Sequence, residues 1–97
     1  MKKYLCTFSL PNEPDDAFWE LIPRHRNYIN GLMRNEVIVT YSVNQQRTKG
    51  WVVINAANKQ EVVHVVEQFP IRSFIDIHVE ELFIFDSMIG TPKLVLN

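Results

Sequence analysis

The sequence contains a single cysteine, Cys6, and this scarcity excludes an internal disulfide framework. A lone thiol suits a reducing compartment, so we expect a cytoplasmic protein. The chain also lacks any apolar run near the roughly 20 residues that a membrane-spanning helix needs. The segment from Tyr4 to Leu10 is too short and too polar for the apolar core of a signal peptide. We therefore expect no membrane partner.

An excess of charge is lacking as well, since ten basic residues face eleven acidic ones for a net charge of −1. The densest basic cluster is Arg24-His25-Arg26, which is too small to drive binding to a phosphate backbone, so we expect no nucleic-acid partner. With three glycines, the chain has no glycine-rich phosphate loop, and it also lacks a nucleophile elbow and a paired-cysteine motif. The sequence therefore predicts no cofactor.

Apolar residues, in contrast, are abundant for a chain of 97 residues. They make up 46% of it and include six Phe, three Tyr and two Trp. A chain of this length forms one domain and buries only about 60–65% of its extended surface when it folds alone. We therefore expect part of the aromatic surface to lie in a subunit interface of a homodimer or larger homo-oligomer.

The first half of the chain predicts a strand, a helix and a hairpin. Residues 3–10 alternate between apolar and polar side chains, which is typical of a strand. A helical apolar stripe then runs from Phe18 to Met33, preceded by acidic residues that suit a helix N-terminus. Pro23 would remove the hydrogen bond to the carbonyl of Trp19, so we expect a kink or a break there. Two β-rich runs, 37–43 and 50–56, flank a polar hairpin loop.

The second half predicts a further helix and strand. Asn58 and Glu61 form a capping-box-like start for a helix that ends at Phe69-Pro70. Residues 74–85 then read as a fourth strand. The predicted order is ferredoxin-like, an α+β fold (βαββαβ) whose four-stranded antiparallel sheet carries both helices on one face. We expect a domain over residues 1–86 and a C-terminal tail, 87–97, that packs on a partner subunit or folds over its own sheet edge.

The phrase Val66-Glu67-Gln68-Phe69-Pro70, followed by the strand from Phe74 to Leu82, resembles the C-terminal half of the muconolactone isomerase family. The resemblance extends from about Arg26 to Phe85, and its specific part, the two segments just quoted, covers a helix end, a connector and a strand. It implies a dimeric α+β barrel, in which two ferredoxin-like sheets pair and ligand pockets lie between sheet and helices or near the subunit boundary. It also implies at least a homodimer, and it carries over no catalytic residue.

His25 is the candidate catalytic base, because it falls on the apolar stripe of the first helix and should face the sheet. A partly desolvated imidazole can abstract a proton next to a carbonyl. Tyr28 and Tyr41 could then donate hydrogen bonds to the enolate oxygen. The alternative is a histidine at the edge of the core, hydrogen-bonded to a neighbour.

Substrate binding is assigned to Arg24 or Arg26, either of which could hold a carboxylate, and to Trp51, which with Trp19 could line an aromatic pocket. Asp76, His78 and Glu80 alternate along one strand and point to one face. Neighbours two apart on a strand converge poorly on one ion, so we interpret this set as a polar sheet face and predict no metal.

Three functions remain open. The first is a muconolactone isomerase-like protein that binds a small organic molecule, as a cofactor-independent isomerase of a lactone or keto acid. The second is a cofactor-free monooxygenase of the same superfold. The third is a non-catalytic ligand-binding or oligomerisation module. A shared fold hosts many chemistries, so the site must decide between them.

Overall fold

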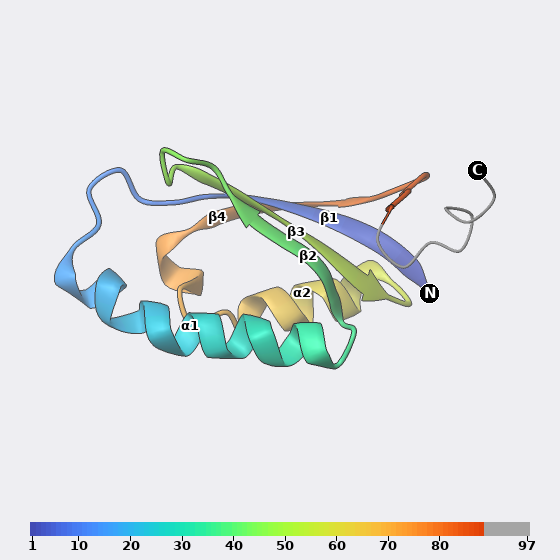
Figure 1. Ribbon diagram of the computed structural model, residues 1–97, viewed down its shortest axis with the longest axis horizontal. Helices are drawn as coiled ribbons and strands as arrows, with labels where there is room; N and C mark the ends of the chain where they lie inside the picture. The colour runs from blue at the N-terminus through green and yellow to red at the C-terminus, as the bar shows by residue number, and fades with distance from the viewer. Residues whose placement is uncertain (89–97) are drawn as a thin grey trace.

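The computed structural model describes residues 1–88, which fold into one antiparallel sheet covered on one face by two helices (Figure 1). The strands lie in the order β2-β3-β1-β4. This is the predicted ferredoxin-like α+β architecture. In chain order the elements are β1 (Lys2–Ser9), α1 (Asp16–Arg34), β2 (Ile38–Val43), β3 (Lys49–Ala56), α2 (Lys59–Glu67), a 3-10 turn (Arg72–Phe74) and β4 (Asp76–Glu81).

The core fills the space between the sheet and the helices. Alternate residues of β1, namely Tyr4, Cys6 and Phe8, are almost fully buried and face the helices. Their neighbours on β3 continue the same apolar layer, and both helices contribute buried residues to it: Val52, Ile54, Phe18, Ile29, Val62 and Val66. Burial raises the pKa of the Cys6 thiol to about 12, so this thiol stays protonated and inert.

Helix α1 begins as the sequence predicts, because the Asp15 side chain accepts a hydrogen bond from the backbone N–H of Phe18 at 3.0 Å. It then runs without interruption through Pro23. Of the two outcomes predicted at Pro23, a break is therefore wrong. The buried residues Phe18, His25 and Ile29 lie on both sides of the proline and pack on the sheet as one stripe, which offsets the roughly 3 kcal/mol that an interior proline costs.

Strand β2 contains a bulge at Val39. Along the pairing with β3, the register passes from Ile38 opposite Ile54 to Thr40 opposite Val53, so one residue of β2 is extra. In a strand with unbroken period-two alternation, Ile38 and Tyr41 are three residues apart and would lie on opposite faces. With the bulge, Tyr41 lies opposite the buried Val52 and faces the helices.

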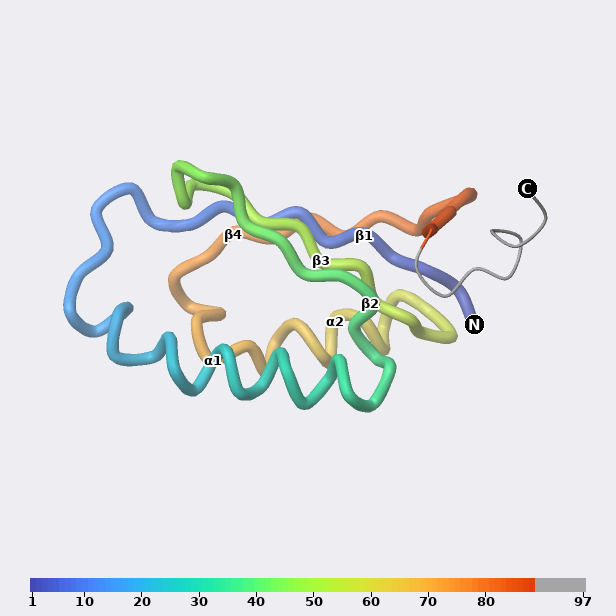
Figure 2. Tube along the Cα trace, viewed as in Figure 1, coloured from blue at the N-terminus to red at the C-terminus, as the bar shows by residue number. Residues whose placement is uncertain are grey.

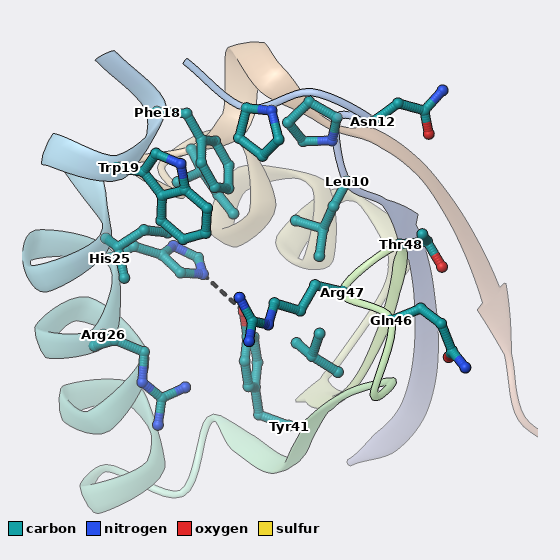
Figure 3. Close-up of a pocket in the computed structure, with 15 residues that line it drawn as sticks. Leu10, Asn12, Phe18, Trp19, His25, Arg26, Tyr41, Gln46, Arg47 and Thr48 are labelled. Carbon is teal, nitrogen blue, oxygen red and sulfur yellow. Dashed lines mark hydrogen bonds between the residues drawn. The ribbon is translucent and has the colours of Figure 1, made fainter. Parts of the chain in front are cut away.

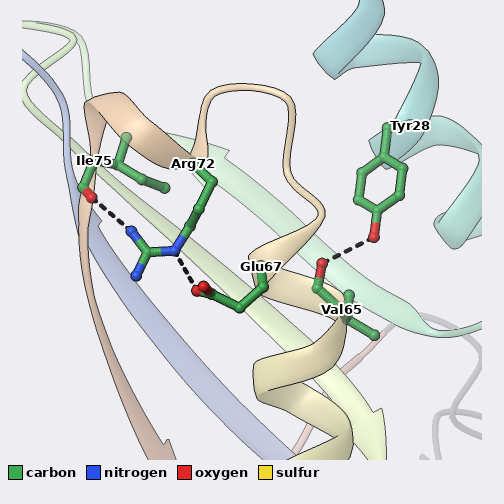
Figure 4. A network of polar contacts seen from close by, with 5 residues as sticks. All are labelled: Tyr28, Val65, Glu67, Arg72 and Ile75. Carbon is green, nitrogen blue, oxygen red and sulfur yellow. Dashed lines mark hydrogen bonds and ion pairs between the residues drawn. The ribbon is translucent and has the colours of Figure 1, made fainter.

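The fourth strand is shorter than the predicted 74–85, because β4 covers Asp76–Glu81. In the described sheet, β4 pairs with β1, and the register ends at Glu81 opposite Tyr4, near the start of β1. At the other end, Phe74 belongs to the 3-10 turn. Arg72 holds this turn, since its guanidinium pairs with Glu67 at 2.6 Å and donates to the carbonyl of Ile75 at 2.9 Å (Figure 4).

Three connections gather at one end of the sheet. Figure 2 shows the β1–α1 loop and the β2–β3 hairpin loop at the same end, with the segment that leads into β4 beside the first turns of α1. Neither helix in the described part is long and apolar enough to cross a membrane. Of the predicted tail, residues 89–97 lie outside the described residues, so its packing stays a prediction.

Candidate functional site

A cavity of about 340 Å³ opens at this end of the molecule, between the first half of α1, the β2–β3 hairpin and the loop after β1 (Figure 3). Most of its wall is apolar, and its polar groups come from α1, from β2 and the hairpin loop that follows it, and from the loop after β1. The lining residues are Leu10, Pro11, Asn12, Pro14, Phe18, Trp19, Ile22, His25, Arg26, Tyr41, Val43, Gln46, Arg47, Thr48 and Ile71.

His25 and Tyr41 form a hydrogen-bonded pair in the cavity wall. His25 Nε2 lies 2.8 Å from the Tyr41 hydroxyl, and the His25 side chain is 1% exposed. The edge of the ring packs against Phe69, with 5.3 Å between ring centroids. Within residues 1–88, His25 Nδ1 has no hydrogen-bond partner and is buried. Burying a nitrogen without a hydrogen-bond partner costs free energy. The His25–Tyr41 pair is therefore a polar group enclosed by largely apolar surroundings.

The electrostatics of this pair keep both members neutral. Burial, and second to it the positive charge of Arg26, together lower the pKa of His25 from its usual 6.5 to about 4. Burial raises the pKa of Tyr41, and Arg26 opposes that rise. At neutral pH the imidazole is therefore uncharged and the phenol keeps its proton. The hydroxyl either donates to Nε2 or accepts from it, according to the tautomer of His25.

Arg26 completes the group from α1. Its guanidinium carbon lies 5.4 Å from the centroid of the Tyr41 ring, which is a cation–π distance. Tyr41 therefore contacts His25 through its hydroxyl and Arg26 through its ring face. The bulge in β2 makes this meeting possible, because it turns Tyr41 toward the helix.

Three of the residues predicted from the sequence come together here: His25, Tyr41 and Arg26 all line the cavity, as does Trp19. The other three lie elsewhere. The Tyr28 hydroxyl donates to the carbonyl of Val65 on α2 at 2.9 Å, and burial raises the pKa of Tyr28. Arg24 is exposed on α1 outside the cavity lining.

Trp51 belongs to the opposite face of the sheet. Its partner on β1 is Thr7, between the inward-facing Cys6 and Phe8. It is therefore not part of the cavity described above. Period-two alternation along β3 contained this information, since Gly50 and Val52 share the inner face.

Sequence reasoning missed the contributions of the loops. Arg47 and Gln46 come from the hairpin loop, and Asn12 comes from the loop after β1. The apolar pattern carries no signal for them, because they are polar residues in irregular segments. The one usable signal was topological, since the hairpin loop and the start of α1 lie at the same end of a ferredoxin-like sheet.

Asp76, His78 and Glu80 lie on the uncovered face of β4, as the alternation predicts. His78 Nε2 is 3.7 Å from Glu80 Oε1, and both side chains are largely exposed. Among residues 1–88, no group of three or more His, Cys, Asp or Glu side chains is arranged to hold a metal ion.

Comparison with known proteins gives a structural match and no sequence match. No protein-family model matches the chain, and no curated protein matches its sequence. Among solved structures, the crystal structure of muconolactone isomerase superimposes with a TM-score of 0.72 at 17% sequence identity. The match covers 92% of this chain and 96% of the isomerase chain. The protein therefore has the fold of muconolactone isomerase.

Proposed function

We propose that the protein binds a small organic molecule in the cavity between α1 and the β2–β3 hairpin, and isomerises it by proton transfer without a cofactor. The observation that carries the proposal is the His25–Tyr41 pair, which is buried, neutral and in the wall of a mostly apolar cavity of about 340 Å³. A cavity of this size suits a small ligand. The substrate class is a lactone or a keto acid, whose carbon acid lies next to a carbonyl.

In the proposed reaction, the substrate carbonyl accepts a hydrogen bond from the Tyr41 hydroxyl. This exchange releases Nε2, which takes the proton from the adjacent carbon, so that a C–H bond breaks and an N–H bond forms. The electron pair moves onto the carbonyl oxygen as an enolate, which Tyr41 and the charge of Arg26 stabilise. The imidazolium then returns the proton to another carbon of the conjugated enolate. No oxidant or reductant is consumed, and His25 ends neutral.

The lowered pKa of His25 restricts this chemistry to acidic carbons. An imidazole with a pKa of about 4 is always free to accept a proton at neutral pH, but it is a weak base. Arg26 is the second cause of the lowered pKa, after burial. A ligand carboxylate beside Arg26 would offset that contribution and would make His25 a stronger base once the substrate is bound.

The test is to replace His25 with Gln and measure turnover of lactones and keto acids that raise the melting temperature of the wild type. We expect the variant to lose turnover while it keeps most of its ligand affinity. His64→Gln, on the exposed face of α2, is the matched control and should behave as the wild type. Undiminished turnover by His25→Gln would contradict the proposed base.

A second candidate is a non-catalytic ligand-binding module, and the low pKa of His25 favours it, because a permanently neutral imidazole also suits a purely structural hydrogen bond. Ligand binding that survives His25→Gln, with no turnover by the wild type, would support it. The aromatic side chains of Phe18 and Trp19 in the cavity wall favour a third, a cofactor-free monooxygenase of aromatic substrates. Oxygen uptake with such a substrate would select it.

The proposal includes a homodimer and a cytoplasmic location. The uncovered sheet face carries the partly exposed Trp51 and Leu5, and Phe83 just beyond β4 is 98% exposed. A second copy that covers this face would remove the apolar surface from water and give the tail, 87–97, a partner to pack on. The location is supported by Cys6, a free and buried thiol.

A further inference from the structure

We propose that Arg47, together with Arg26, forms an anion clamp at the mouth of the cavity, and that the ligand is therefore a small carboxylic acid with a flat apolar body. The inference rests on the proposed function, since it names the ligand class of the same cavity. It adds a specificity-determining residue from the hairpin loop.

The charge of the lining is the first observation. Arg26 and Arg47 both line the cavity, and no Asp or Glu is among the described residues that do. The lining therefore carries two positive charges and no negative one, although the whole chain has a net charge of −1. A positive cavity with partly apolar walls concentrates small anions.

The two guanidinium groups have no carboxylate partner of their own. Within residues 1–88, the ion pairs are those of Lys2 with Glu81, Arg72 with Glu67 and His78 with Glu80. Arg26 contacts the face of the Tyr41 ring, which leaves its N–H edges free to donate. Each guanidinium can therefore offer two parallel donors to a carboxylate.

The hairpin loop is built to present Arg47. This residue has a φ of 60°, in the left-handed region that costs free energy for a side chain other than glycine or asparagine. The Asn44 side chain holds the turn with three hydrogen bonds. Its Oδ1 accepts from the N–H groups of Thr48 and Lys49, and its Nδ2 donates to Thr48 Oγ1. The backbone N–H of Arg47 also donates to the carbonyl of Asn44 at 3.0 Å.

As a result, the two arginines approach from different elements. In Figure 3, Arg47 extends from the hairpin across the cavity toward α1, whereas Arg26 reaches from α1 toward Tyr41. A carboxylate held between them would bridge the hairpin and the helix. The body of the ligand would then lie on the apolar wall formed by Leu10, Phe18, Ile22 and Val43. It would point toward the His25–Tyr41 pair, both members of which line the same cavity.

The experiment compares acids with neutral molecules of the same shape. Benzoate, phenylacetate and 3-phenylpropanoate, and the primary amide of each, are titrated calorimetrically into the wild type, Arg47→Gln, Arg47→Lys and Arg34→Gln at pH 7.5. Arg34→Gln removes the same charge from the exposed end of α1 and is the control for net charge. We expect the wild type to prefer the best acid over its amide at least tenfold, which is about 1.4 kcal/mol.

Arg47→Gln should lose most of that preference and bind the amide as the wild type does. Arg47→Lys should keep part of it, because lysine retains the charge without the planar fork. Arg34→Gln should keep all of it. Added salt should weaken binding of the acid and leave that of the amide unchanged.

Three outcomes would overturn the clamp. Equal affinity for acid and amide in the wild type would refute it and leave the cavity as a ligand site. An unchanged preference in Arg47→Gln would remove Arg47 from the site and leave Arg26 to explain the preference. Failure of every acid to bind at millimolar concentration would refute the clamp, and failure of the amides as well would count against the proposed function itself.

Discussion

At the scale of the residue, burial controls the protonation of His25. The side chain is 1% exposed, and the nearby charge is the positive one of Arg26. Both conditions disfavour the imidazolium, so the folded protein resists a proton that the unfolded chain takes up readily. The folding free energy must therefore depend on pH in the range between the two pKa values.

We predict a loss of stability in mild acid that depends on His25. The pKa is 6.5 in the unfolded reference and about 4 in the folded protein. Above pH 6.5 neither state is protonated and the stability is complete; as the pH falls from 6.5 toward 4, the unfolded state gains a proton first. The full effect is about 3 kcal/mol. Urea unfolding of the wild type and His25→Gln at several pH values measures it.

His25→Gln should lose the part of the pH dependence between 4 and 6.5 while keeping the part that arises from carboxylates. Parallel curves for the two proteins would mean that His25 takes up its proton in the folded state as readily as in the unfolded one. That result would also remove the argument for a permanently neutral imidazole in the site.

A second prediction at this scale concerns Gly50. A Cβ at this position would lie 2.1 Å from the tip of the Phe8 ring, and Phe8 is itself 1% exposed. Gly50→Ala should therefore destabilise the protein by about 1–3 kcal/mol through overpacking. Gly31→Ala is the matched control, because a Cβ there meets nothing closer than Arg34 at 3.9 Å. Because Gly31 lies inside α1, in its last turn, that alanine should stabilise by about 0.5–1 kcal/mol.

Chemical denaturation of both glycine variants measures these changes in the free energy of unfolding. If Gly50→Ala proved as stable as the wild type, the Phe8 ring would have room to move. The inner layer of the sheet would then be less tightly packed than the close approach of strand and ring implies.

At the scale of the element, the two helices are joined by a polar contact as well as by the core. The Tyr28 hydroxyl on α1 donates to the carbonyl of Val65 near the end of α2 (Figure 4). That carbonyl belongs to the last turn of α2, where it also accepts from the backbone N–H of Gln68 at 3.2 Å. Tyr28 therefore supplies a second donor to this acceptor, from a neighbouring helix.

We predict that Tyr28→Phe lowers the free energy of unfolding by about 1 kcal/mol, the usual net contribution of such a hydrogen bond. Ligand affinity should stay unchanged, because Tyr28 is outside the cavity lining. Denaturant melts and calorimetric titration on the same preparation measure the two quantities. A variant of normal stability that has lost ligand binding would instead place Tyr28 in the site.

At the scale of the whole molecule, one face of the sheet is covered by helices and the other is open (Figure 1). We predict that a second copy covers the open face. Light scattering coupled to size-exclusion chromatography should give the mass of a dimer for the wild type and a shift toward monomer for Trp51→Glu, which places a charge on that face. Val63→Glu, on the exposed side of α2, is the control and should remain dimeric.

A wild type that stays monomeric at high concentration would contradict this assembly. A dimer that persists in Trp51→Glu would place the interface elsewhere on the surface. Loss of ligand affinity in a monomeric but folded variant would show that the cavity depends on the second copy.

Most of the fold could be predicted from local patterns. The alternation over residues 3–10, the Asn58 cap and the break at Phe69-Pro70 correspond to observed elements within a residue or two. The predictions that failed concern features that depend on contacts with another segment of the chain. A break was one of the two outcomes expected at Pro23, but packing keeps the helix whole, and β4 was predicted too long because its length follows from the start of β1.

The candidate site was predictable only in part, for a related reason. His25 and Arg26 could be placed on α1 because helical periodicity says which side faces the sheet. The face of Tyr41 depends on a bulge that alternation cannot reveal, and the approach of Arg47 depends on a strained turn and on the distance between loop and helix. These are relations between segments far apart in the chain.

By itself, the sequence determined the strands, the helices, their order and the inward position of His25, since apolar periodicity and capping act over a few residues. The tertiary structure decided that His25 meets Tyr41 and that Arg26 and Arg47 share one cavity. The physical reason is that these contacts depend on register and on loop geometry, which form only when the whole sheet closes over its helices.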